Sequence, residues 1–203
     1  LPPPLVEEGW LDQAMVVPWY LPFFYLFFLH GTWGGFLSFS IGFGLWSAFE
    51  YCVHRFLYHG SWLGDTGWID TPLIRGLHCW AHGHHHRVPD DPLRVIHSPL
   101  LTLPCGFLLS FIIPSSVFCG FVCGYILFEL CHYALHQIDA NPSHFWPFCT
   151  VFWKERRQSH LAHHRILDSS RLKYGCSKPI HSFGVTSNIG DIVFQTDQQA
   201  KVS

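Results

Sequence analysis

This chain has few charged side chains. Charged side chains account for only 13% of its 203 residues, whereas 49% are hydrophobic and 17% aromatic. A typical soluble domain carries a charged share of about 25%, so the composition argues against an ordinary soluble protein. The 12 basic and 14 acidic residues nearly cancel and leave a net charge of −2. A charge so close to zero gives no reason to expect nucleic acid as a partner.

Signals for secretion and for disulfide cross-linking are also missing. No basic stretch precedes the first apolar run, which instead follows Glu7 and Glu8, so we expect no cleavable signal sequence. The eight cysteines lie mostly within or beside apolar segments, where cysteine behaves as a small hydrophobic residue and not as half of a disulfide. No internal repeat divides the sequence. We therefore expect a single domain over residues 1–203.

Long runs without charge are what the chain does have. Three runs, Met15–Leu29, Thr32–Phe49 and Ile96–Phe128, contain no Asp, Glu, Lys or Arg, and Pro114 interrupts the third. A helix needs about 20 residues to cross a hydrocarbon layer of about 30 Å. A soluble α-protein with two buried hairpins is the alternative, and it would need far more polar surface than this chain offers. The sequence thus predicts an all-α integral membrane protein with about four transmembrane helices in two hairpins, at residues 14–30, 33–53, 97–113 and 115–131.

Histidine is the polar residue that the chain has in abundance. There are 16 histidines, and ten of them fall into four short clusters beside the apolar runs. Side chains three or four residues apart share one face of a helix, and three of the clusters have this spacing. His54 and His59 would be about 140° apart on an α-helix, so we expect them where a helix ends or bends. The clusters are His54 with His59, His82 with His85 and His86, His132 with His136, and His160 with His163 and His164.

Ten imidazoles in this arrangement predict a metal centre. Neutral imidazole binds zinc, copper, iron or nickel, and the clusters contain no cysteine, which argues against a zinc finger or an iron–sulfur site. Ten ligands are too many for one ion, whereas two ions with about five each would keep an open octahedral position, as catalysis requires. His84 leaves a second register open, in which it replaces His86 as a ligand. The other histidines are expected to be ordinary core or surface residues: His30, His78, His84, His97, His144 and His181.

The predicted topology places all four clusters on one side of the membrane. An even number of crossings separates them, so they can meet in one polar cap formed by residues 54–96 and 132–196. The basic residues of the chain concentrate in these same regions, whereas the opposite turns carry almost none. By the positive-inside rule the cap and its metal site face the cytosol.

The residues around the clusters resemble a known family. Four stretches carry the likeness: Glu50–His59, His82–Arg94, Gly124–His136 and His160–His164. Together they resemble the fatty acid hydroxylase superfamily, and the Pro-x-Asp-x-x-Arg pattern that ends at Arg94 is similar to its fatty acid 2-hydroxylase branch. Phe183–Ser187 and Asp191–Thr196 resemble the closing motifs of that branch. The likeness extends from about Gly44 to the end of the chain.

The resemblance implies an oxidoreductase of the endoplasmic reticulum membrane that hydroxylates C2 of a long-chain fatty acid, or of the N-acyl chain of ceramide, in sphingolipid biosynthesis. It assigns the ten clustered histidines as ligands of two metal ions and implies that electrons come from cytochrome b5. Because no cytochrome b5 domain precedes the first predicted helix, we expect a separate cytochrome b5 and its reductase. His84 and the stretch 168–181, which looks like an insertion, depart from the family pattern.

The implied chemistry also constrains the metal and its surroundings. Cleavage of an unactivated C–H bond needs a redox-active metal, and zinc has no redox chemistry. Iron is therefore the expected active metal, even where purified protein contains zinc. Glu50 and Glu129 each lie about one helical turn before a clustered histidine and are predicted to accept the second N–H of a ligand. Arg87 and Arg94 are predicted to bind the polar head of the lipid substrate.

Two alternatives stay open. A related sterol or sphingoid-base hydroxylase or desaturase would have the same metal centre, and analysis of its products would distinguish it. A membrane metal-binding protein or transporter without enzymatic activity would place its ligands near the middle of the membrane. The clusters instead lie at predicted helix ends and in loops, which favours an enzyme.

Overall fold

The computed structural model describes residues 35–59, 71, 79–89, 91–137, 151–165 and 181–197. Every regular element in these ranges is a helix, in agreement with the predicted all-α fold. The first predicted span, 14–30, lies outside them. The elements are α3 (Phe36–Cys52), the π-helix η1 (Val53–Tyr58), the π-helix η2 (Cys79–Gly83), α5 (His84–Arg87), α6 (Pro92–Val95), α7 (Pro99–Ser110), α8 (Ser115–Gln137), α9 (Val151–Arg165) and α10 (Ile189–Val193).

Two helices among the described residues are long and apolar enough to cross a membrane. They are the continuous helix Phe36–Tyr58, formed by α3 and η1, and α8, each of 23 residues. At about 1.5 Å per residue an α-helix of this length measures about 35 Å, which matches the thickness of a bilayer core. Large apolar side chains such as Phe36, Leu37 and Ile41 are exposed on α3, as contact with lipid requires.

The second predicted hairpin differs from its prediction in its first helix. α7 has only 12 residues and contains Pro104, so at about 18 Å it is shorter than the predicted segment 97–113. α8 begins at Ser115, as predicted, and continues past the predicted membrane span to Gln137. His132 and His136 therefore lie on one unbroken helix, as their spacing predicts.

Glycines let α3 and α8 pack with their backbones in contact. A Cβ atom on Gly42 would lie only 1.9 Å from the carbonyl oxygen of Val117, and one on Gly120 would lie 2.0 Å from the carbonyl oxygen of Phe39. Small residues at such crossings are the usual way in which membrane helices approach one another closely. Further along the same interface the Trp46 side chain fills the space beside Gly124.

The end of the first long helix widens from an α-helix into a π-helix. η1 covers Val53–Tyr58, and the amide of His59 donates to the carbonyl of His54 at 3.2 Å. Because a π-helix closes its hydrogen bonds over five residues, it brings residues five apart onto one face. The His54 and His59 rings accordingly lie with their centroids 5.0 Å apart. The prediction that this pair marks a helix end is confirmed. The π-turn is the local conformation that places two histidines five residues apart on the same face of the helix.

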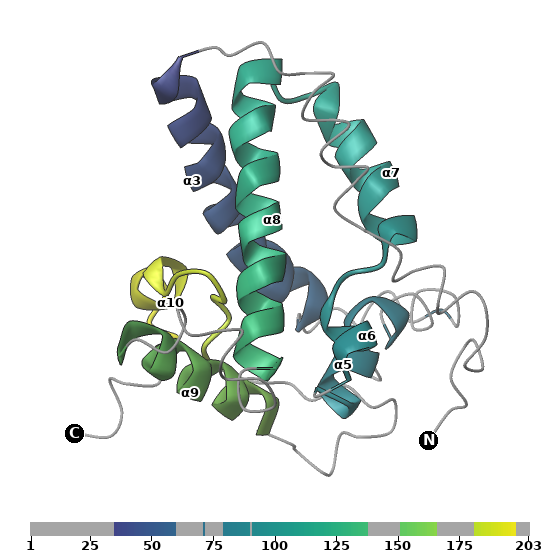
Figure 1. The fold of residues 1–203 in the computed structure, drawn as a ribbon, viewed down its shortest axis with the longest axis vertical. Helices are drawn as coiled ribbons and strands as arrows, with labels where there is room; N and C mark the ends of the chain where they lie inside the picture. Colours follow the sequence, from purple (N-terminus) through teal and green to yellow (C-terminus); the bar gives the residue numbers. More distant parts are fainter. Residues whose placement is uncertain are drawn as a thin grey trace.

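The helices fall into two regions along the long axis of the molecule. Figure 1 shows α3, α7 and α8 extending toward one end, while α5, α6, α9 and α10 gather around the other end of α8. The apolar core lies between the long helices and is built mainly of aromatic side chains. Its fully or nearly buried members include Trp46, Phe118, Phe121, Tyr125 and Phe128.

Candidate metal centre

The ten clustered histidines converge at the end of the molecule where the short helices gather. They form two groups of five, in each of which one nitrogen per ring lies within 4.8 Å of the others. Nine of the ten side chains are buried and His59 is partly buried. The first group is His54, His59, His82, His86 and His163, and the second group is His85, His132, His136, His160 and His164.

Helical spacing explains how two of the clusters serve both groups. His160 and His164 on α9 are four residues apart and belong to the second group, whereas His163 turns toward the first. The cluster around η2 and α5 does the reverse, since His82 and His86 join the first group and His85 joins the second. The two groups are therefore adjacent, and the rings of His86 and His164 lie with centroids 4.3 Å apart across the boundary. This division could not be read from the spacing alone.

Backbone carbonyls orient two of the rings in the first group. Nδ1 of His54 donates to the carbonyl oxygen of Phe183 at 2.5 Å, and Nδ1 of His163 donates to that of His181 at 2.9 Å. A carbonyl oxygen can only accept, so Nδ1 carries the hydrogen in both neutral rings and Nε2 carries a lone pair. Nε2 of each ring has no hydrogen-bond partner among the described residues. Both side chains are thus held with a free lone pair turned into the group, as metal binding requires.

The second group has the same character. Nε2 of His85 and of His132 is buried and has no hydrogen-bond partner among the residues that the structure describes. Nε2 of His136 lies 2.9 Å from Nε2 of His160. Buried nitrogens that converge without donors between them carry an energetic penalty unless a cation binds them, so the residues present fit a metal ion in each group.

Burial also sets the protonation state that a ligand needs. Removal from water lowers the pKa of His82, His85 and His86 well below the usual value of 6.5, and the neighbouring imidazoles lower it further. The same causes lower the pKa of His160 and His163. These rings are therefore neutral near pH 7, with a lone pair available for a metal.

Among the described residues no histidine donates a hydrogen bond to Glu50, contrary to the prediction. Its Oε1 accepts the amide hydrogens of Val185 and Thr186 at 2.7 and 3.1 Å, and its Oε2 accepts the hydroxyl of Thr186. The closing loop, residues 181–197, supplies these donors together with the Phe183 carbonyl that binds His54. The physical reason is that a buried carboxylate is better satisfied by several backbone and hydroxyl donors than by one ring N–H. Glu50 thus acts on His54 through the closing loop.

Asp191 holds the same loop from the other side. Its two carboxylate oxygens accept the amide hydrogens of Phe183 and Gly184, both at 2.9 Å, and one also accepts the hydroxyl of Thr196 at 2.8 Å. Arg156 of α9 is buried and interacts electrostatically with both Asp191 and Glu50. The charge of this arginine offsets part of the cost of burying two carboxylates.

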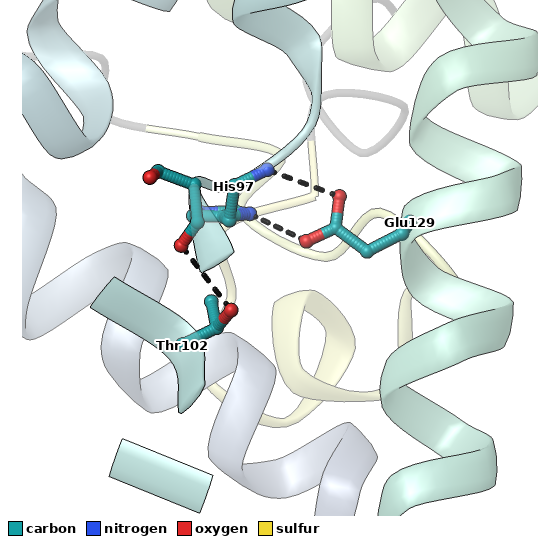
Figure 2. Close-up of polar contacts among 4 residues, drawn as sticks. His97, Thr102 and Glu129 are labelled. Atoms are coloured by element: carbon teal, nitrogen blue, oxygen red, sulfur yellow. Dashed lines mark hydrogen bonds and ion pairs between the residues drawn. The ribbon is translucent and has the colours of Figure 1, made fainter. Parts of the chain in front are cut away.

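Glu129 has a different partner from the one predicted. It is fully buried, and its Oε1 accepts Nδ1–H of His97 at 2.8 Å, while its Oε2 accepts the His97 amide at 3.4 Å (Figure 2). His132, the histidine that Glu129 was expected to bind, has neither ring nitrogen bonded to a described residue. A carboxylate on α8 points sideways to the segment before α7, because a side chain three residues from His132 does not reach that ring's nitrogens. His97 was expected to be an ordinary residue.

An apolar cavity of about 330 Å³ leads to both groups of histidines. It lies between α3, α7 and α8 and is lined mostly by aliphatic and aromatic side chains, among them Phe49, Leu109 and Phe121. Members of both groups form part of its wall, namely His54 and His82 from the first group and His132 from the second. A long apolar molecule in this cavity would have one end beside the nitrogens.

Of the two predicted head-group arginines, the structure describes the side chain of Arg94 alone, and Arg94 is not among the residues that line the cavity. Arg94 is largely buried, and its Nε lies 3.8 Å from a carboxylate oxygen of Asp91. The side chains of Arg87 and His84 lie outside what the structure describes. The alternative in which His84 replaces His86 as a ligand is therefore not tested. Both groups nevertheless assemble from His82, His85 and His86 without it.

The residues that sequence reasoning missed act through the backbone or across the fold. The carbonyls of Phe183 and His181 have no signature in sequence, because every residue has a carbonyl. Asp191 and Thr196 were noticed only as part of a family motif, and the structure shows what they hold. His97 carried a weak signal, since Glu129 is an acid in an apolar helix and such an acid needs a partner.

Comparison with known proteins identifies relatives that cover most of this chain. The chain is 33% identical to the dihydroceramide fatty acyl 2-hydroxylase FAH1 of Arabidopsis thaliana over 168 residues, which cover 77% of this chain and 58% of that protein. It is 30% identical to the fatty acid 2-hydroxylase of Macaca fascicularis over 166 residues, 78% of this chain and 38% of the relative. Over most of its length the chain is therefore similar to fatty acid 2-hydroxylases. The predicted resemblance is therefore confirmed.

Other comparisons bear on the extent and the fold of this hydroxylase homologue. The ceramide very long chain fatty acid hydroxylase of Schizosaccharomyces pombe is 28% identical over 219 residues, 96% of this chain and 56% of the relative. The chain thus spans between 38% and 58% of the length of these three relatives. A solved structure described as full-length scs7p, with only its hydroxylase domain visible, shares the fold with a TM-score of 0.60 at 23% identity, over 93% of this chain and 66% of that one. No protein-family model matches the chain.

Proposed function

We propose that this protein is a fatty acyl 2-hydroxylase that inserts one oxygen atom of O₂ into the C2–H bond of a long acyl chain. The single observation that carries the proposal is that two groups of five largely buried histidines assemble beside an apolar cavity, with members of both groups in its wall. The other oxygen atom leaves as water, so each turnover takes up two electrons and two protons from a donor. The names of the relatives support the reaction and its place in sphingolipid synthesis.

The cavity supports an acyl chain as the substrate. Its wall is formed by hydrophobic side chains from three helices, including Trp46, Leu101 and Val122. An acyl chain that binds against this wall is stabilised, because apolar surface of both the chain and the wall is removed from water. Only the end beside His54, His82 and His132 is rich in nitrogen. A fatty acyl group has the matching distribution, with one polar end and a long apolar tail.

Two metal ions, one in each group of histidines, complete the proposed site. Iron would supply the redox chemistry that oxygen activation and C–H cleavage require, whereas zinc could occupy the same nitrogens without supporting the reaction. The chain itself contributes neutral rings held in place, with Phe183 and His181 fixing the hydrogen on the far side of two of them. The apolar wall of the cavity keeps water away from the substrate carbon.

The remaining assignments belong to the same proposal. Electrons come from a separate cytochrome b5 and its reductase, and the protein lies in the endoplasmic reticulum membrane as a multi-pass protein with the histidines facing the cytosol. Two candidate membrane helices and the membrane-lipid substrates named for the relatives support a membrane location. Arg87 and Arg94 remain our candidates for binding the polar head of the lipid.

The test is to express the chain in cells that lack their own fatty acid 2-hydroxylase and to measure 2-hydroxy ceramides by mass spectrometry. We expect these lipids to appear with the native chain and to be absent with His163→Ala. Gln158→Ala is the matched control, because Gln158 is exposed on the same helix and belongs to neither group. Hydroxylated sterols or sphingoid bases in place of 2-hydroxy acyl chains would show that the centre serves another substrate.

A second test concerns the metal. Purified protein loaded with a series of iron and zinc ratios should form 2-hydroxy product in proportion to its iron content. The assay should require O₂, cytochrome b5 and its reductase together. Activity that rises with zinc and is indifferent to iron would refute the proposed chemistry.

A further inference from the structure

A buried ion pair lies beside the two histidine groups without belonging to either. Glu129 has 0% exposed surface in an otherwise apolar helix, and it binds both the ring and the amide of His97 (Figure 2). An isolated buried carboxylate costs several kcal/mol, so a partner that can carry a positive charge is needed. His97 is the side chain on Glu129 that can do so.

Glu129 binds one of the two ring nitrogens of His97. Its Oε1 accepts Nδ1–H at 2.8 Å, and Figure 2 shows Nδ1 facing Glu129, so Nε2 is on the other side of the ring. An imidazolium carries a hydrogen on both nitrogens, so His97 paired as a cation with this carboxylate has a second N–H at Nε2. His97 is part of the wall of a cavity that is otherwise lined mostly by apolar side chains.

Two aromatic rings place this donor beside both metal groups. The Tyr58 ring stacks on His82 of the first group, with centroids 4.4 Å apart, and on His97 at 5.9 Å. The Phe128 ring lies between His97, at 5.7 Å, and His132 of the second group, at 5.5 Å. All five residues belong to the cavity wall. His97 is thus one ring away from each group.

We propose that Nε2–H of His97, held by Glu129, donates a hydrogen bond to the carbonyl oxygen of the acyl substrate and so selects C2 for hydroxylation. This inference rests on the proposed function. C2 is the carbon next to the carbonyl, so a donor that fixes the carbonyl beside the histidine groups presents C2 to them. A fatty acyl chain has many chemically similar CH₂ groups, and the apolar wall of the cavity cannot distinguish one from the next by more than a small free-energy difference.

Three variants separate this role from a structural one. His97→Leu removes the donor. His97→Gln keeps an amide N–H at about the position of Nε2 and is the matched control. Glu129→Gln keeps an oxygen that accepts Nδ1–H of His97 but removes the negative charge, so His97 becomes neutral and Nε2 loses its hydrogen. The pair remains joined in Glu129→Gln while the donor to the substrate is lost.

The experiment measures the position of hydroxylation by mass spectrometry, together with kcat/KM and metal content, in purified full-length protein. We expect His97→Leu and Glu129→Gln to lower kcat/KM about tenfold, as the loss of a charged hydrogen bond does, and to form products hydroxylated beyond C2. Metal content should equal that of the native chain. His97→Gln should restore C2 selectivity.

The inference and the proposed function fail in different ways. A native chain that forms no 2-hydroxy product would refute the proposed function. A native chain that forms it, together with His97→Leu and Glu129→Gln variants that hydroxylate only C2 at the native kcat/KM, would refute the role of His97. Equal losses of folded protein, metal and activity in all three variants, with C2 selectivity unchanged, would also refute it and would leave the pair as a structural tie between α8 and the segment before α7.

Discussion

The two ends of the long helix α8 are stabilised by different means. Near its start, Gly120 lies against the backbone of α3, so that the two helices are in close contact without a side chain between them. Near its end, His132 and His136 face other imidazoles, and the surrounding side chains are fixed by hydrogen bonds to the closing loop. At the apolar end the volume of a residue matters, whereas at the histidine end the number and direction of its lone pairs and hydrogens matter.

This contrast predicts which substitutions each end tolerates. The apolar end should accept a change of residue type as long as no atom is added at the helix crossing. The histidine end should accept no change that removes a lone pair, even where the replacement is smaller. Substitutions matched within each region therefore sharpen the comparison.

The largest effect is expected at the histidines. Alanine at His85, His136 or His163 removes one nitrogen from a group of five. We expect turnover to fall at least about a hundredfold, since the ligands of one metal centre act as a unit and the loss of one impairs the whole centre. Metal content should fall from two ions per chain toward one. Iron analysis and product formation on the same purified samples provide the measurement.

His144→Ala is the comparison for these variants, because His144 is not one of the ten clustered histidines and should have a much milder effect. Near-normal turnover in any two of the three cluster variants would refute the assignment of ligands. Unchanged metal content in both His136→Ala and His163→Ala would contradict a division into two separate groups.

How much of this site the sequence predicts depends on the kind of interaction. Spacing within each cluster predicts which histidines share a helix face, because side chains three or four residues apart lie on one side of a helix, and all ten clustered histidines come together in the structure. The division of His163 from His160 and His164 was not predictable, since it depends on where α9 lies relative to the other helices. The partners of Glu50 and Glu129 were also missed, because the closing loop and His97 are distant in sequence.

The fold shows the same limit. Uncharged runs were sufficient to locate α3 and α8, since the cost of exposing polar groups in a membrane acts on each segment separately. A helix end at His54 and His59 was predicted, whereas its π-helical form and the short length of α7 were not. Local rules thus predict elements and candidate ligands, whereas pairings between distant segments need the structure.

The second largest effect should be seen at the helix crossing. Gly42→Ala would place a Cβ 1.9 Å from the carbonyl oxygen of Val117, so α3 and α8 must move apart. We expect a loss of about 1–3 kcal/mol of stability, the usual cost of overpacking. Thermal unfolding in detergent measures it. Gly44→Ala is the matched control, because no atom lies within 4 Å of a Cβ at Gly44 on the same helix; an equal loss in both variants would show that close packing is not the cause.

A smaller and more selective effect is expected at the closing loop. Asp191→Asn replaces an oxygen that accepts a backbone N–H with an amide that donates, so one of the amides of Phe183 and Gly184 loses its acceptor. The Phe183 carbonyl would then hold His54 less well, and we expect metal affinity of the first group to fall about tenfold, the lower end of the range for such changes. Competition with a chelator measures this affinity. Glu155→Gln, exposed on α9, is the control, and weaker binding in the second group alone would contradict the role of the loop.

The smallest effect is expected where the apolar end meets the closing loop. The hydroxyl of Ser47 on α3 lies 2.9 Å from that of Ser187 and is partly buried. Ser47→Ala removes this hydrogen bond, so we expect a loss of about 0.5–1.5 kcal/mol with little change in turnover. Ser40→Ala is the matched control, since the Ser40 hydroxyl is exposed and donates only to the carbonyl of Phe36 in its own helix. Unfolding of both variants in detergent provides the measurement. A turnover loss in Ser47→Ala as large as in Asp191→Asn would show that the apolar helix positions the closing loop directly, and the separation between the two regions would then not hold.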